Sequence, residues 1–278
     1  MTFPFEPAAG SFSIKNALGS ALASQLAYSD RAAIEAKAKG DWGFASVKHY
    51  ATSSGSLIDT QGFLATRNDM ALFAFRGTEP GTIQDWLTDD EALLVPTPMG
   101  HLHHGFWSAF KTVETAILND LKTDPGIQGK PLWITGHSLG AALSTILSVS
   151  CSMADLKVAG HYNFGSPRVG DTSFRNFYNE RCAAATFRFV NNNDIVPRVP
   201  PRELLYTHVD FKRYLDSHCK LVADTRIVDL LLDSFEGNLL GLRKVFGQIG
   251  YIKKQNLPWP DFIEDHFIQS YINCIQKN

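Results

Sequence analysis

A serine between two glycines, in Gly136-His137-Ser138-Leu139-Gly140, is the stretch best suited to chemistry. Because an apolar run precedes it and a helical pattern follows it, we predict a sharp turn between a buried strand and a helix. Ser138 would stand clear of the backbone, and the glycines would let strand and helix approach closely. The helix N-terminus would direct free N–H groups at an oxyanion beside Ser138. The pattern therefore predicts a nucleophilic serine.

Such a serine needs a base to take its proton and an acid to hold that base in the right tautomer. Asp194 is the favoured acid, because it follows a predicted strand at the edge where open parallel sheets place functional groups. His266 is the favoured base, since it lies well beyond Asp194 at the start of a predicted final helix. His208 and His218, in a strand-like segment, stay open as alternative bases.

Strand-like and helical segments alternate along the chain. The apolar patterns predict strands near residues 45–51, 62–66, 70–75, 158–164 and 185–190, besides the strand before the serine, and helices within 13–37, 105–121 and 172–180. Asn68-Asp69 is typical of a hairpin turn. This order predicts an α/β fold with a mostly parallel central sheet and helices on both faces.

Four further segments carry weaker patterns. Residues 205–209 and 211–215 are strand-like. Residues 227–246 are strongly apolar with interrupting glycines, so we expect one broken helix or two short ones, packed on the core rather than facing lipid. Residues 79–97 mix leucines and Trp86 with acids, which suits a short amphipathic helix serving as a movable lid or as plain surface.

Composition excludes several functions. The chain has 278 residues, enough for one large domain or two small ones, and its net charge of −2 without a basic cluster argues against nucleic-acid binding. No apolar run is long enough to span a membrane, and the N-terminus does not read as a signal peptide. The histidines at 101, 103 and 104 lack a nearby carboxylate or thiol in ligand spacing, so no metal is expected.

The four cysteines are widely spaced and include no C-x-x-C pair. We therefore expect neither a zinc site nor a redox motif. Nothing in the spacing demands a disulfide, and free buried thiols are the favoured interpretation for Cys151, Cys182, Cys219 and Cys274.

Six motifs in order resemble the class 3 lipase family, whose best-known members are the filamentous-fungal triacylglycerol lipases. Besides the serine turn they are Phe75-Arg76-Gly77-Thr78, His104-Gly105-Phe106, Phe164-Gly165-Ser166-Pro167-Arg168-Val169-Gly170, Asn193-Asp194-Ile195-Val196-Pro197 with Pro200-Pro201, and Asp265-His266 with Tyr271. The resemblance covers the chain from about residue 45 to its end.

The resemblance implies an α/β-hydrolase fold, as a single domain over 1–278, with a helical lid at about 79–97. It implies Ser138 as nucleophile, His266 as general base and acid, and Asp194 as the residue that orients His266. It further implies an oxyanion hole built from Thr78 and the backbone N–H of Leu139, and no cofactor or metal. An apolar insertion at about 222–250 departs from the family pattern, as does the lack of an evident signal peptide or disulfide.

The expected function is that of a serine carboxylic-ester hydrolase, a lipase that cleaves acylglycerols at an oil–water interface through an acyl-enzyme. A feruloyl esterase or a phospholipase of the A1 type are alternatives within the same fold, and the apolar residues of 79–97 favour lipid. A catalytically silent binding module would need a broken site, whereas all five site positions carry competent residues. The sequence does not predict the oligomeric state, and both a cytoplasmic location and export by another route stay open.

Overall fold

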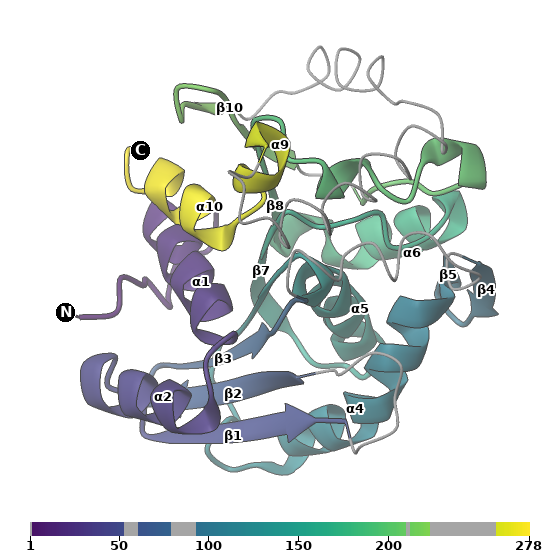
Figure 1. The fold of residues 1–278 in the computed structure, drawn as a ribbon. Helices are drawn as coiled ribbons and strands as arrows, with labels where there is room; N and C mark the ends of the chain where they lie inside the picture. The colour runs from purple at the N-terminus through teal and green to yellow at the C-terminus, as the bar shows by residue number, and fades with distance from the viewer. Residues whose placement is uncertain (1, 53–60, 79–92, 210–211, 223–259) are drawn as a thin grey trace.

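A central sheet organises the fold (Figure 1). The computed structural model describes residues 2–52, 61–78, 93–209, 212–222 and 260–278. Within them, eight strands lie in the order β1-β2-β3-β6-β7-β8-β9-β10. Their bounds are β1 Ser46–Ala51, β2 Gln61–Arg67, β3 Met70–Phe75, β6 Leu132–His137, β7 Val158–Phe164, β8 Thr186–Asn191, β9 Lys212–Leu215 and β10 Leu221–Val222. The pairs from β3 to β9 are parallel, while β1, β2 and β10 are joined by antiparallel pairing.

Helices cover both faces of this sheet, as predicted (Figure 1). The α-helices described are α1 Ile14–Leu26, α2 Arg31–Glu35, α4 His104–Thr123, α5 Leu139–Met153, α6 Thr172–Cys182, α9 Asp261–Glu264 and α10 Ile268–Ile275. A π-helical turn, Ala36–Asp41, follows α2, and short 3-10 turns lie at Ala183–Ala185, Val196–Arg198 and Arg202–Leu204. A small separate sheet pairs β4 (Leu94–Thr97) with β5 (Gly100–His103).

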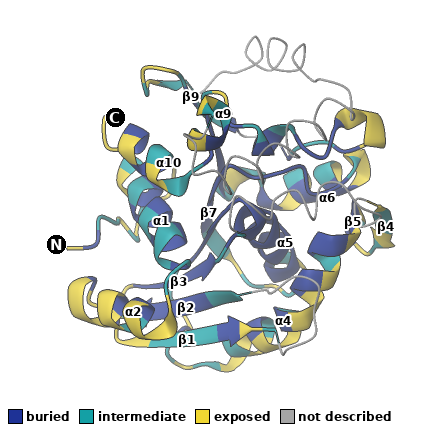
Figure 2. Cartoon of the chain, viewed as in Figure 1, coloured by how far each residue is buried: buried dark blue, intermediate teal, exposed yellow. Residues whose placement is uncertain are grey.

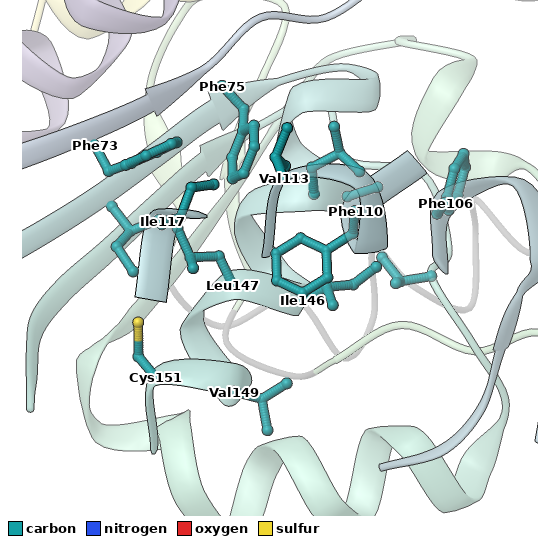
Figure 3. Packing of buried hydrophobic residues seen from close by; sticks show 14 of the residues in the cluster. Phe73, Phe75, Phe106, Phe110, Val113, Ile117, Ile146, Leu147, Val149 and Cys151 are labelled. Carbon is teal, nitrogen blue, oxygen red and sulfur yellow. The ribbon is translucent and has the colours of Figure 1, made fainter. Parts of the chain in front are cut away.

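One face of the sheet packs on α4, α5 and α6. Figure 3 shows Phe73 and Phe75 of β3 against side chains of α4 and α5, among them Phe110, Ile117 and Leu147. Apolar residues recur every three to four positions along α4, so they form one stripe that faces the sheet. Each phenylalanine fully buried here contributes about 2–3 kcal/mol of transfer free energy.

The opposite face packs on α1 and α10. Leu72 and Ala74 point this way because successive strand residues alternate between faces, and Trp133 of β6 lies in the same cluster. Since helices cover both sides, every residue of β3 is buried (Figure 2). Burial on both faces explains why β3 is a continuous apolar run rather than an alternating one.

The parallel strands bring the predicted site residues to one edge. Thr78, Ser138 and Asp194 follow the carboxyl ends of β3, β6 and β8, and these ends meet at the same edge because the strands are parallel. His266 lies between α9 and α10. The backbone N–H of Ile195 donates to the carbonyl of Phe262 at 3.3 Å, which joins α9 to the loop that carries Asp194.

One predicted strand and one predicted helix need correction. Residues 205–209 form no strand: Leu205 has a left-handed backbone (φ +68°), and only Thr207 makes a single bridge, to Gly170. The edge of β8 is instead occupied by β9, which matches the strand-like segment 211–215 in its described residues. The helix predicted within 79–97 does not extend to residue 97, because Leu94–Thr97 forms strand β4. Residues 79–92 lie outside the described residues.

The cysteine prediction was half wrong. Cys219 and Cys274 form a disulfide that joins the turn between β9 and β10 to helix α10, whereas Cys151 and Cys182 are free and buried as expected. The apolar insertion at about 222–250 lies outside the described residues apart from Val222, the last residue of β10.

Candidate active site

Ser138 occupies a strained turn between β6 and α5. Its backbone has φ 59° and ψ −127°, a conformation that a side chain other than glycine adopts only at a cost. Its N–H donates to the carbonyl of Phe164 on β7 at 3.0 Å, which fixes the turn to the neighbouring strand. A Cβ on Gly136 would lie 2.1 Å from the carbonyl oxygen of Gly140, so a side chain there cannot fit. The glycines therefore permit the close approach predicted from the sequence.

The structure brings Ser138, Asp194 and His266 together, and all three are buried. His266 Nε2 lies 2.9 Å from Ser138 Oγ, and His266 Nδ1 lies 3.0 Å from Asp194 Oδ2. Because a carboxylate oxygen only accepts, Nδ1–H donates to Asp194 and leaves the Nε2 lone pair facing the serine hydroxyl. In this arrangement Ser138 can pass its proton to His266 while its oxygen attacks an electrophile.

Asp194 is held at both carboxylate oxygens. Oδ1 accepts the N–H of Val196 at 2.9 Å, and Oδ2 accepts the hydroxyl of Tyr271 at 2.6 Å in addition to His266. The Tyr271 oxygen in turn accepts the backbone N–H of Asn191 at 3.1 Å. Burial and the neighbouring Asp194 charge raise the pKa of Tyr271 well above its usual value, so it remains a donor. Tyr271 stood in a sequence motif, but its contact with Asp194 was not predicted.

Gly165 lies against both the acid and the base of the site. Its backbone is left-handed (φ +58°), and a Cβ there would lie 2.9 Å from both Asp194 Oδ2 and His266 Nδ1. Any side chain at this position would press on the hydrogen bond between the acid and the base. The glycine after β7 is therefore needed for space as well as for backbone conformation.

Of the two predicted oxyanion donors, Leu139 directly follows Ser138, and Thr78 directly follows a glycine that packs against it. Leu139 is the first residue of α5, where a backbone N–H has no intrahelical acceptor. Thr78 follows Gly77, and a Cβ on Gly77 would lie 3.1 Å from the Cβ of Ser138. The loop after β3 thus passes directly by the serine.

The alternative bases have other partners. His208 donates from Nε2 to the carbonyl of Pro197 at 2.6 Å, and His218 is exposed in the turn between β9 and β10. Among the other histidines considered, His101 pairs with Asp171 at 3.0 Å, and His103 Nδ1 accepts the N–H of Phe106 near the start of α4.

The parallel sheet, the serine turn after β6 and the acid after β8 define an α/β-hydrolase fold. The model of the class 3 lipases matches residues 72–204. The chain belongs to the class 3 lipase family. No helix among the described residues is long and apolar enough to cross a membrane.

Curated relatives agree with this family. The secreted mono- and diacylglycerol lipase A of Penicillium cyclopium is 30% identical over 202 residues, which are 68% of this chain and 63% of the relative. The secreted mono- and diacylglycerol lipase 1 of Fusarium solani is 34% identical over 123 residues, or 41% of this chain and 34% of the relative. The chain thus spans less than two thirds of the length of these relatives.

Solved structures show the same fold. A mutant form of MDLA from Penicillium cyclopium has a TM-score of 0.62 at 24% identity, covering 90% of this chain and 92% of that one. The Rhizomucor miehei lipase in complex with its propeptide has a TM-score of 0.54 at 22% identity, covering 73% and 68%. At these identities the likeness concerns the fold alone.

Proposed function

We propose that this protein is a serine carboxylic-ester hydrolase that cleaves acylglycerols. The observation that carries the proposal is the position of His266, whose two ring nitrogens lie 2.9 Å from Ser138 Oγ and 3.0 Å from Asp194 Oδ2. A serine hydroxyl is a weak nucleophile until an adjacent base takes its proton, and His266 is placed to do so.

The reaction proceeds in two halves. Ser138 Oγ attacks the ester carbonyl while His266 takes the hydroxyl proton, and Asp194 holds the imidazolium that forms. The oxyanion lies against the N–H of Leu139 and the donors of Thr78, each worth about 3 kcal/mol of barrier lowering. His266 returns the proton to the leaving alcohol, which leaves Ser138 acylated. Water, deprotonated by His266, then releases the fatty acid and restores the serine.

Acylglycerols are the proposed substrates because of the relatives. The Penicillium and Fusarium proteins are named mono- and diacylglycerol lipases, and the family match includes both Ser138 and Asp194. We further propose that the chain folds as one domain and that residues 79–97 act as a lid. The support for the lid is the apolar pattern of that segment, together with the complete burial of Ser138, to which substrate must gain access.

The test is hydrolysis of p-nitrophenyl esters and of mono-, di- and triacylglycerols of increasing chain length, below and above the concentration at which droplets form. We expect activity on medium or long chains, a rise in rate at the interface, and no activity for Ser138→Ala. Ser144→Ala is the matched control, because Ser144 is buried in α5, the helix that begins directly after Ser138, and its hydroxyl donates to the carbonyl of Ala141.

Each outcome decides between functions. Hydrolysis confined to short soluble esters would make the protein a simple esterase. Preference for a phospholipid or a feruloyl ester in the same panel would select one of those activities instead. Wild-type activity in Ser138→Ala would reject the assignment of the nucleophile, and a wild-type protein inactive on every ester would favour a binding module.

A further inference from the structure

His137 lies beside the proposed catalytic histidine and contacts its backbone. Its ring centroid is 4.6 Å from that of His266, and its Nε2 is 2.6 Å from the carbonyl oxygen of His266. On the other side of the ring, Nδ1 is 2.8 Å from the hydroxyl of Tyr28. His137 is thus hydrogen-bonded at both ring nitrogens. One partner is the hydroxyl of Tyr28, which lies two residues after α1, and the other is the backbone of His266.

The chemistry of these partners fixes the direction of both bonds. Burial lowers the pKa of His137 well below its usual value, so the ring is neutral and carries one N–H. A carbonyl oxygen can only accept, so this N–H is at Nε2 and donates to His266. Nδ1 is then an acceptor, and the Tyr28 hydroxyl donates to it. Both hydrogen bonds are therefore donated in the same direction: Tyr28 donates to His137, and His137 donates to the His266 carbonyl.

The same hydroxyl adjoins the loop that leads to Thr78. A Cβ on Gly77 would lie 2.2 Å from the Tyr28 oxygen, 2.5 Å from the carbonyl of His137 and 3.1 Å from the Cβ of Ser138. Tyr28 therefore contacts the loop that leads to Thr78 directly, and it is linked to the backbone of His266 through the side chain of His137.

We propose that Tyr28 and His137 are positioning residues, which hold the backbone of His266 so that its imidazole stays in register with Ser138; this rests on the proposed function. Without the Tyr28 hydroxyl, only the His266 carbonyl favours the proton on His137 Nε2, and Nδ1 loses the donor that fixes the other side of the ring. In the other tautomer, the Nε2 lone pair would face the His266 carbonyl oxygen at 2.6 Å, and the repulsion would displace His266. Tyr28 lies outside the family match at 72–204, so the N-terminal segment contributes to the site.

The structure offers a matched pair of variants for the test. Tyr28 and Tyr50 line the same cavity of about 450 Å³, and each hydroxyl makes a short hydrogen bond, to His137 and to Asp120 (2.6 Å) respectively. Tyr28→Phe and Tyr50→Phe thus each remove one hydroxyl group from a tyrosine that lines this cavity. Only the first removes a contact to the site.

We would measure kcat and KM on a soluble short-chain p-nitrophenyl ester, the rate at which diethyl p-nitrophenyl phosphate inactivates the enzyme, and Tm. For Tyr28→Phe we expect kcat and the inactivation rate to fall together by about tenfold with KM unchanged, because a small misplacement of a catalytic group has costs of this order or larger. Tyr50→Phe should keep both rates within about twofold of wild type whatever its Tm, since its hydroxyl contacts no site residue.

A second variant separates positioning from general loosening. His137→Gln keeps a side-chain N–H for the His266 carbonyl but has no ring tautomers, so adding Tyr28→Phe to it should lower kcat by less than about twofold. Equal rate losses in Tyr28→Phe and Tyr50→Phe, a loss expressed in KM, or full additivity in the double variant would each overturn the proposal. Activity that survives Ser138→Ala would instead reject the proposed function, which keeps the two failures distinct.

Discussion

Acidification from pH 7.5 to 5.5 should cost this protein about 4 kcal/mol of unfolding free energy through three histidines. Burial lowers the pKa of His161 to about 3 and those of His137 and His208 well below their usual value. In the unfolded chain all three would titrate near about 6.5, so below that pH the unfolded state binds more protons than the native state. At pH 5.5 the imbalance amounts to RT ln(1 + 10), about 1.4 kcal/mol for each histidine.

The assay is urea unfolding at pH 5.5, 6.5 and 7.5, a range in which few carboxylates titrate. His161→Gln should lose about a third of this pH dependence, close to 1.4 kcal/mol, whatever the variant's own stability, because glutamine does not titrate. His218→Gln, which changes an exposed side chain, should leave the pH dependence as in the wild type. An identical pH dependence in wild type and His161→Gln would refute the reasoning, since it would mean that folding does not lower the pKa of His161.

Three further predictions concern the site and the disulfide between Cys219 and Cys274. Asp194→Asn should lower kcat by on the order of 10⁴ with little change in Tm, because an amide no longer holds His266 in the required tautomer; near-normal kcat would contradict the role of Asp194. Gly165→Ala places a Cβ 2.9 Å from both Asp194 Oδ2 and His266 Nδ1, so kcat should fall at least about tenfold, whereas an unchanged kcat would show that the site yields easily. Cys219→Ser opens the disulfide to Cys274, whose partners are 55 residues apart, and should cost about 2–4 kcal/mol in urea unfolding; an unchanged midpoint would show that the crosslink adds no stability.

Local sequence patterns were sufficient to predict those parts of the fold that depend on neighbouring residues. The unbroken apolar run of β3 needed burial on both faces, and the spaced apolar residues of α4 needed one covered face. Gly136 and Gly140 could only serve a close contact of backbones, so the turn at Ser138 was predictable from five residues. These features depend on neighbours in the chain, which the sequence displays directly.

Motif order extended the prediction to the site. Asp194 and His266 were placed with Ser138 because they follow it at positions typical of the family, although their contact spans 72 residues of chain. Spacing alone left His208 and His218 open as bases. The residues around a histidine in the sequence do not reveal whether its ring will hydrogen-bond a serine hydroxyl or a backbone carbonyl.

Contacts between residues far apart in the chain could not be predicted from local patterns and became visible in the folded structure. The pairing of Cys219 with Cys274 depends on where α10 docks beside the β9–β10 turn, and cysteine spacing does not carry that information. Residues 205–209 have the composition of a strand, yet β9 takes the available edge of β8, and a strand without a partner has no ladder to join. The hydroxyl of Tyr28 gains its place next to His137 in the same way. In each case the deciding energy is a contact between segments far apart in the chain, which exists only once the sheet has brought them together.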